Sequence, residues 1–300
     1  MHDSRHNARP ITDPEIMPLV DIGANLSHDS FRHDLDDVLA RAAAHDVAQI
    51  VVTGASREGT IAAYALAMQY PNRLFATAGM HPHHASDYDS ETDALLREHV
   101  AHAEVKAVGE TGLDYFRDLS PRAAQLFAFE RQLDIAVNCG KPLFLHQRDA
   151  HADFLGCIDT VRHQIGAAVV HCFTGERKEL FDYLDRDLYI GITGWICDER
   201  RGLHLRELVK NIPANRLMIE TDAPYLLPRN LQPMPGHRRN EPMHLAHICT
   251  EIARDRGEEV ELTAAQTSAT ARAFFRLPDV LTNDAPEESA TVPSPEKTFR

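Results

Sequence analysis

The chain has 300 residues, of which 43% are apolar and 25% are charged, the usual balance of a globular protein. A chain of this length can bury enough surface to fold without a structural metal or disulfides, which excludes collagen-like, coiled-coil and largely disordered proteins. The 31 Lys and Arg against 45 Asp and Glu give a net charge of −14. That charge excludes a protein that coats nucleic acid non-specifically, but not a nuclease with local contacts.

The sequence predicts a cytoplasmic protein. Residues 1–17 are polar and do not resemble a signal peptide, and no apolar run approaches the roughly 20 residues that span a membrane. The five cysteines are an odd number without a Cys-x-x-Cys pair, so we expect reduced thiols rather than a disulfide framework or a zinc cluster. They are Cys139, Cys157, Cys172, Cys197 and Cys249.

Eight short apolar runs, rich in β-branched residues, recur along the chain. They are residues 19–23, 49–54, 74–79, 105–109, 142–146, 168–172, 188–193 and 217–222. Short continuous apolar runs are typical of parallel strands that are buried on both faces. We therefore predict eight parallel β-strands.

The segments between these runs have helical periodicity. Apolar stripes fall at residues 31, 35, 38, 39 and 42, and at residues 126, 129, 133, 136 and 137. Eight strand–helix units in about 255 residues predict an α/β fold of the (β/α)8 TIM-barrel type, with an open doubly wound sheet as the alternative. We assign residues 18–276 to this domain, 1–17 to an N-terminal extension and 277–300 to a disordered tail.

Four ionisable residues stand at the ends of four predicted strands: Glu110, His146, His171 and Asp222. The C-terminal strand ends of a barrel meet at one mouth, where active sites lie. Two imidazoles and a carboxylate can ligate a divalent cation, and a further carboxylate can take a proton from the attacking water. A lone histidine here is more often structural, but four such groups are costly to bury unless they are used. The pattern predicts a metal-assisted hydrolase.

Five motifs in the same order resemble the TatD family of metal-dependent deoxyribonucleases, over residues 20–275. They are Gly79-Met-His-Pro-His, Gly109-Glu-Thr-Gly-Leu-Asp, His146-Gln-Arg-Asp, His171-Cys-Phe-Thr-Gly and Glu220-Thr-Asp-Ala-Pro. The resemblance implies a TIM barrel related to the amidohydrolases and a magnesium-dependent nuclease. Residues 191–203 and 238–242 are typical of one branch of the family, for which it implies 3′→5′ exonuclease activity on single-stranded DNA and RNA in the cytoplasm.

The resemblance also suggests roles for the mouth residues. It implies that Glu110, His146 and His171 hold the metal, and that Asp222 is the candidate general base. Residue chemistry alone would favour zinc or manganese at two histidines. We expect Mg²⁺ as the activator, with Mn²⁺ or another divalent cation as a substitute.

The first strand departs from the family pattern. Most members end it with Asp-x-His-x-His, whose histidines hold one of two metals, whereas this chain has Gly23 and Asn25 at those places. Glycine offers no ligand, and a carboxamide is a weak one. We therefore expect one firmly held metal, with any second ion weak or dependent on substrate.

Other residues are candidates for contact with substrate. His81 and His83 could contact phosphate or protonate the leaving oxygen, or they could belong to a turn held by backbone hydrogen bonds. Arg148 could bind a phosphate oxygen, or it could pair with Asp149 or Asp114.

Trp195 is the only tryptophan of the chain and follows the seventh strand. It could stack on an unpaired base or simply fill the core. Residues 195–240 contain eight Arg and Lys against five Asp and Glu, a local charge of +3. Arg200, Arg201, Arg238 and Arg239 are therefore candidates for nucleic-acid binding, although a solvated face would give the same pattern.

Two other functions are compatible with the sequence. A barrel hydrolase of an ester or amide bond, such as a D-aminoacyl-tRNA deacylase, would use the same metal. A non-enzymatic scaffold would not need Glu110, His146, His171 and Asp222. We expect single-stranded DNA and RNA as substrates, no membrane association, and a monomer.

Overall fold

A computed structural model describes residues 18–280. The expected N-terminal extension lies outside the described residues, as does the expected tail from residue 281 onward. Eight parallel strands form one sheet whose order follows the chain: β1 (Leu19–Ala24), β2 (Val47–Val52), β3 (Leu74–Ala78), β4 (Val105–Asp114), β5 (Leu143–Arg148), β6 (Ala168–Val170), β7 (Tyr189–Ile192) and β8 (Leu217–Ile219). This order confirms the predicted TIM barrel and excludes the doubly wound sheet.

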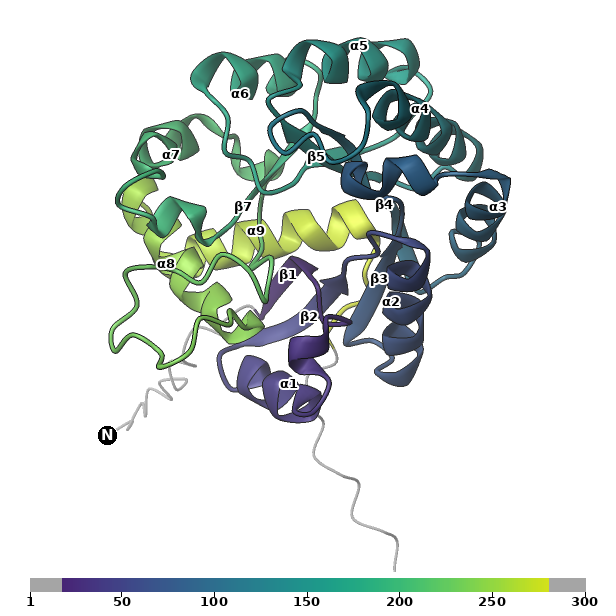
Figure 1. Ribbon diagram of the computed structural model, residues 1–300. Helices are drawn as coiled ribbons and strands as arrows, with labels where there is room; N and C mark the ends of the chain where they lie inside the picture. Colours follow the sequence, from purple (N-terminus) through teal and green to yellow (C-terminus); the bar gives the residue numbers. More distant parts are fainter. Residues whose placement is uncertain (1–17, 281–300) are drawn as a thin grey trace, which may run out of the picture.

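Nine α-helices occur within residues 18–280. They are α1 (Leu35–Ala43), α2 (Arg57–Gln69), α3 (Ser90–His99), α4 (Arg122–Cys139), α5 (His151–Val161), α6 (Arg177–Leu184), α7 (Leu203–Leu208), α8 (Leu245–Arg256) and α9 (Val260–Phe275). Helices α1 to α8 follow one another around the barrel, and α9 crosses the middle of this ring (Figure 1).

The barrel closes between its first and last strands through bonds near the mouth. The Asp222 N–H donates to Gly23 O at 2.8 Å, and the Asn25 N–H donates to Ala223 O at 2.6 Å. The buried Asp21 carboxylate accepts the Thr221 N–H at 3.0 Å and the Thr221 hydroxyl at 2.5 Å. Burial is the main influence on Asp21 and raises the pKa of its carboxyl to about 7.

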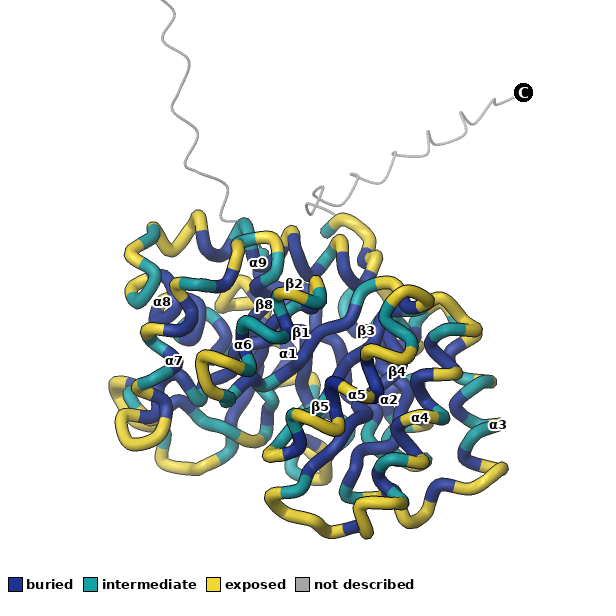
Figure 2. The backbone as a smooth tube through the Cα atoms, turned by 90° about the horizontal axis from the view of Figure 1, so that it is seen from above, coloured by how far each residue is buried: buried dark blue, intermediate teal, exposed yellow. Residues whose placement is uncertain are grey.

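Two apolar cores lie on the two sides of the barrel wall. The larger core packs the outer faces of the strands against the surrounding helices. The smaller core fills the barrel, where Val51, Phe75 and Val169 meet Phe274 and Phe275 from the end of α9. Helix α9 therefore plugs the end of the barrel opposite to the mouth. Buried backbone runs through the middle of the molecule, and exposed backbone lies on the outer turns (Figure 2).

Of the two predicted apolar helical stripes, the structure confirms one as a helix and changes the start of the other. The second stripe lies on α4, as expected. The first begins with Phe31, which is fully buried but belongs to a short 3₁₀ turn, Asp29–Phe31, so that α1 itself starts only at Leu35. An apolar stripe records which side chains are buried, and a 3₁₀ turn buries Phe31 equally well.

Two further expectations concern membrane association and thiols. Within residues 18–280, no helix is both long and apolar enough to cross a membrane. All five cysteines lie in this range and are free.

An ion-pair network attaches the long segment after β8 to α1. Arg239 Nη2 lies 2.6 Å from Asp34 Oδ2 and 2.7 Å from Glu241 Oε1, and Arg41 Nε lies 2.8 Å from Glu241 Oε2. Glu241 is only 3% exposed. Burial opposes its ionisation, but Arg41 and Arg239 outweigh that effect and hold the pKa of Glu241 below its ordinary value of 4.5.

We predict that Glu241→Gln lowers the free energy of unfolding by about 2 kcal/mol at neutral pH, because two arginines lose their buried partner. A carboxyl with a depressed pKa stabilises the fold above its unfolded pKa, and this stabilisation is lost as pH falls through the folded pKa. The difference between wild type and variant should therefore shrink below about pH 4.5. Urea unfolding over a pH series measures it; a difference that stays constant with pH would contradict this account.

Candidate active site at the barrel mouth

The four residues that were predicted at strand ends line one cavity of about 810 Å³ at the mouth. Glu110 and His146 lie within β4 and β5, while His171 and Asp222 follow β6 and β8. β4 is longer than predicted, because it pairs with β5 as far as Asp114 and Arg148.

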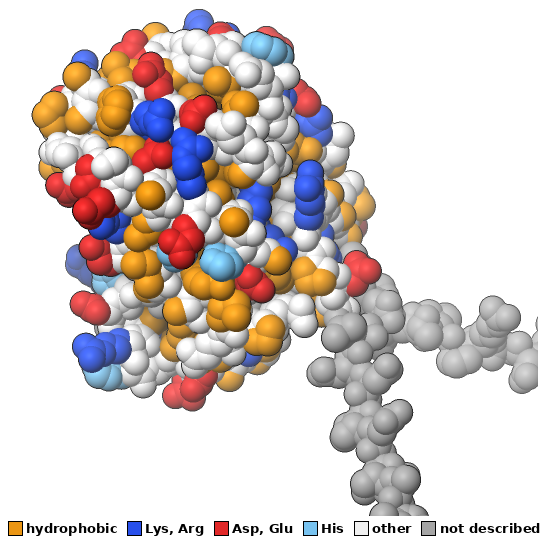
Figure 3. Space-filling view, turned by 90° about the vertical axis from the view of Figure 1, so that its right-hand side faces the viewer, with side chains coloured by type: hydrophobic (Ala, Val, Ile, Leu, Met, Phe, Trp, Pro, Cys, Tyr) orange, Lys and Arg blue, Asp and Glu red, His pale blue; other side chains and the backbone are white. Residues whose placement is uncertain are grey.

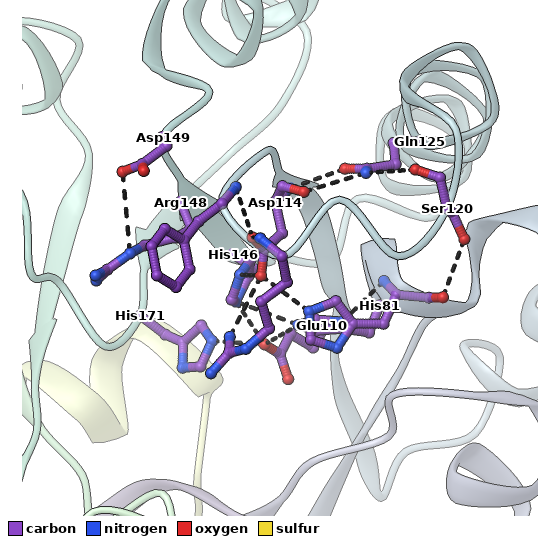
Figure 4. A network of polar contacts seen from close by, with 12 residues as sticks. His81, Glu110, Asp114, Ser120, Gln125, His146, Arg148, Asp149 and His171 are labelled. Atoms are coloured by element: carbon purple, nitrogen blue, oxygen red, sulfur yellow. Dashed lines mark hydrogen bonds and ion pairs between the residues drawn. The ribbon is translucent and has the colours of Figure 1, made fainter.

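Glu110 lies among three imidazoles (Figure 4). Its Oε1 is 2.8 Å from His171 Nε2, 3.0 Å from His146 Nδ1 and 3.3 Å from His81 Nε2. The carboxylate is 7% exposed. Burial opposes its ionisation, but the neighbouring histidines, His171 first, outweigh that effect and hold the pKa of Glu110 well below its ordinary value. Glu110 is therefore a charged oxygen donor, as a metal ligand must be.

A second carboxylate orients each of the two predicted histidine ligands. His146 Nε2 lies 3.3 Å from Asp114 Oδ2, and His171 Nδ1 lies 3.4 Å from Glu220 Oε2. An imidazole that donates one N–H to a carboxylate offers the lone pair of its other nitrogen to a metal. In both rings this other nitrogen faces Glu110. The free nitrogens of His146 and His171 therefore both face the Glu110 carboxylate, as nitrogen and oxygen ligands of one divalent cation would.

His81 also lies close enough to be considered as a ligand. The ligand atoms of His81, Glu110 and His146 lie within 4.8 Å of one another. However, His81 Nδ1 accepts the His83 N–H at 3.1 Å, so in the neutral ring the proton is on Nε2. Burial lowers the pKa of His81 to about 4, which favours the neutral ring. This arrangement makes His81 a hydrogen-bond donor toward Glu110 rather than a ligand.

Glu220 is fully buried, and the sequence analysis assigned it no role. Its Oε1 accepts the Cys172 N–H at 2.5 Å. A Cβ on Gly23 would overlap its Oε2, and a Cβ on Gly191 would lie 2.8 Å from its Oε1. The Glu220 carboxylate therefore occupies the space in which a side chain at position 23 would lie.

Asp114 is the second residue whose part in the site the sequence analysis missed. Its Oδ1 accepts the N–H groups of Phe116 and Arg117, while its Oδ2 lies 2.9 Å from His83 Nε2 as well as near His146. His83 is thus fixed to the carboxylate that orients His146. The sequence does contain a pattern that could have indicated this role: Asp114 is four residues beyond Glu110, so the two side chains lie on the same face of a strand.

Asp222 lies beside the proposed metal ligands and is fixed by Asn25. Asn25 Nδ2 donates to Asp222 Oδ1 at 3.1 Å. Burial is the main influence on this group and raises the pKa of Asp222 to about 8, although His171 opposes the shift. A cation bound beside Glu110 would favour the ionised carboxylate.

Arg148 lines the cavity and does not make the predicted pair with Asp114. Its Nη1 donates to Thr174 Oγ1 at 2.5 Å, and its Nε is 4.0 Å from Asp149. The guanidinium lies 5.1 Å from the centre of the Phe116 ring and 5.7 Å from that of Trp195. These contacts hold the guanidinium at the wall of the cavity.

The four candidate arginines do not form one patch. The guanidinium groups of Arg200 and Arg201 both pair with Asp198, and Arg201 also lies 4.4 Å over the Trp195 ring. Arg238 is exposed beside them. Arg239 instead pairs with Asp34 and Glu241 in the ion-pair network that attaches the segment after β8 to α1. Its guanidinium therefore stabilises the fold at that place.

Comparisons with known proteins agree with this geometry. The family model described as TatD related DNase matches residues 20–276. A relative from Enterobacter lignolyticus (strain SCF1), named 3′-5′ ssDNA/RNA exonuclease TatD, is 49% identical over 86% of this chain and 98% of its own. The TatD homologue YJJV of Escherichia coli K12 is 27% identical, with a TM-score of 0.80 over 88% of this chain and 100% of its own.

A guanine deaminase from C. acetobutylicum shares the barrel alone. It is 8% identical and has a TM-score of 0.54 over 87% of this chain and 73% of its own. This likeness shows the barrel fold and nothing more specific.

We predict that Gly23→Ala weakens metal binding by about 10- to 100-fold, because the new methyl group displaces the Glu220 carboxylate that orients His171. Isothermal titration with Mn²⁺ measures the affinity. Gly156→Ala on α5 is the matched control, since a Cβ there meets nothing within 4 Å. Equal affinities in the two variants would show that Glu220 does not support the site.

Proposed function

This chain belongs to the TatD related DNase family, and on that premise we propose that it is a metal-dependent 3′→5′ exonuclease of single-stranded DNA and RNA. The observation that carries the proposal is the buried Glu110 carboxylate, placed among imidazoles at an open mouth that Arg148 also lines. The names of relatives with nearly half of their residues identical supply the polarity and the substrate.

We propose that Glu110, His146 and His171 hold one Mg²⁺, with Mn²⁺ as a substitute. Such a cation would polarise a phosphoryl oxygen and lower the pKa of water. A single ion is supported by the first strand, where Gly23 leaves space that Glu220 fills and Asn25 donates to Asp222. Neither residue offers the imidazole with which, by the resemblance, most of the family holds a second ion.

The remaining groups have complementary parts in hydrolysis. Asp222, oriented by Asn25, is the candidate base that accepts the proton of the attacking water. His81 presents Nε2–H beside Glu110 Oε1, where it can donate to a phosphoryl or leaving oxygen in the cavity, and Asp114 holds His83 next to it. Arg148 can bind the phosphate through its guanidinium.

Trp195, Arg200 and Arg201 would contact the nucleic acid beside this centre. Because Arg148 and Arg201 both lie over the Trp195 ring, we propose that Trp195 orients their guanidinium groups, a role that differs from both sequence alternatives, stacking on a base and filling the core. We also propose a monomer in the cytoplasm, where the five free thiols would remain reduced.

The two other functions have weaker support. An ester or amide hydrolase, such as a D-aminoacyl-tRNA deacylase, would use the same centre, but the relatives are named as nucleases. A scaffold would not need a buried carboxylate among three imidazoles, because such a group is costly unless it is used.

A 5′-labelled single-stranded oligonucleotide tests the proposal. With Mg²⁺ we expect a ladder that shortens from the 3′ end, and with EDTA we expect no cleavage. Glu110→Gln keeps the size of the side chain but removes its charge, so cleavage should fall at least about 1000-fold. An oligonucleotide left intact with Mg²⁺, Mn²⁺ and Zn²⁺ would refute the nuclease assignment and make aminoacyl-tRNA the next substrate.

Asp222→Asn distinguishes the base from a ligand in the same assay. We expect the rate to fall about 100-fold or more while metal content remains that of the wild type. Loss of metal in this variant would make Asp222 a ligand and leave the base unassigned.

A further inference from the structure

A second cavity of about 810 Å³ adjoins the one that holds the candidate metal ligands. It lies between residues 194–201, which follow β7, and residues 226–238, which follow β8. The two cavities share four lining residues: Trp195, Arg201, Leu226 and Arg238. The two cavities therefore adjoin at these residues, and together we call them the groove; Glu110 lines only the first.

The second cavity is basic in an acidic protein. Arg200, Arg201, Arg229 and Arg238 line it, and the acidic residues paired with them are Asp198 and Glu199, so that the local charge is 4 − 2 = +2. The whole chain carries −14. On the side of the molecule that carries α2 and α3, basic and acidic side chains are instead interspersed (Figure 3). A local positive field of this kind attracts a polyanion.

The guanidinium groups of Arg200, Arg201 and Arg229 are paired with carboxylates before any ligand arrives. Asp198 is 4% exposed, and its Oδ2 lies 3.4 Å from Arg200 Nη2 and 3.2 Å from Arg201 Nη2. Trp195 supports Arg201 from its ring face. Such pre-organisation reduces the entropy lost on binding. Apolar side chains, including Pro228 and Met234, complete the lining and offer a surface for a base or sugar.

The positions of the phosphates in a nucleic-acid strand show which of its nucleotides these arginines can contact. A 3′-terminal nucleotide has one phosphate toward the rest of the strand, and that phosphate is the one cleaved beside Glu110. Arginines farther along the groove can therefore meet phosphates only on the 5′ side of the scissile bond. We propose that the second cavity binds the retained strand, meaning the nucleotides immediately 5′ of the bond that is cut. This inference rests on the proposed 3′→5′ nuclease function.

The proposal predicts a dependence on substrate length. A dinucleotide without a terminal phosphate has only the scissile phosphate, whereas a tetranucleotide adds two phosphates on the 5′ side. We expect the wild type to cleave the 3′-terminal bond of the tetranucleotide with a kcat/KM at least about tenfold above that of the dinucleotide. We call this ratio the length advantage.

Met234→Glu tests the cavity by placing a negative charge in it. Met234 is 49% exposed and lines the second cavity but not the first, so the change should not prevent folding. We expect the length advantage to fall about tenfold, because the new carboxylate repels the retained phosphates. Met68→Glu is the matched control, since Met68 lies on α2, lines neither cavity and is 53% exposed. It should keep the length advantage of the wild type.

Arg238→Ala provides an independent variant that removes positive charge. It should also lower the length advantage and reduce the salt dependence of oligonucleotide binding, while Arg216→Ala, just before β8 and outside both cavities, should do neither. An unchanged length advantage in Met234→Glu and Arg238→Ala, or an equal loss on both substrates, would overturn the proposal. A wild-type protein that cleaves neither substrate would instead refute the nuclease function.

Discussion

The charge of Glu110 is the constraint on which the mouth of the barrel depends. A carboxylate that is 7% exposed must be matched by positive or hydrogen-donating groups, and three imidazoles surround its Oε1. Two of these imidazoles are in turn held by Asp114 and Glu220. The result is a centre in which buried carboxylates and imidazoles lie side by side, an arrangement that offers oxygen and nitrogen ligands to a cation.

The same constraint explains the altered first strand. The space left by Gly23 is filled by Glu220, and the side chain of Asn25 donates to Asp222. The neighbouring backbone closes the barrel through bonds between residues 21–25 and 221–223. In this chain the contacts between β1 and the residues after β8 therefore support the side chains of the candidate centre.

The fold, and the convergence of the four strand-end residues on one mouth, could be predicted because both follow from short-range patterns. Eight apolar runs predicted eight strands, and polar residues at their ends, such as His146 and His171, predicted one shared mouth. The supporting residues were harder to find, because the importance of Glu220 depends on Gly23, nearly two hundred residues away. Arg239 belonged to a basic run in sequence, yet its partners Asp34 and Glu241 place it in the network behind α1. Local charge counts cannot show which arginines already have a buried partner.

The number of metal ions bound per chain tests the central claim most directly. Equilibrium dialysis against Mn²⁺, followed by elemental analysis, should give one ion per wild-type chain. Almost no ion should bind to Glu110→Gln or to the double variant that carries both His146→Ala and His171→Ala. His81→Ala should still bind one ion, because the ring donates a proton and does not ligate. Two ions per wild-type chain, or undiminished binding by Glu110→Gln, would contradict a single metal centre built on Glu110.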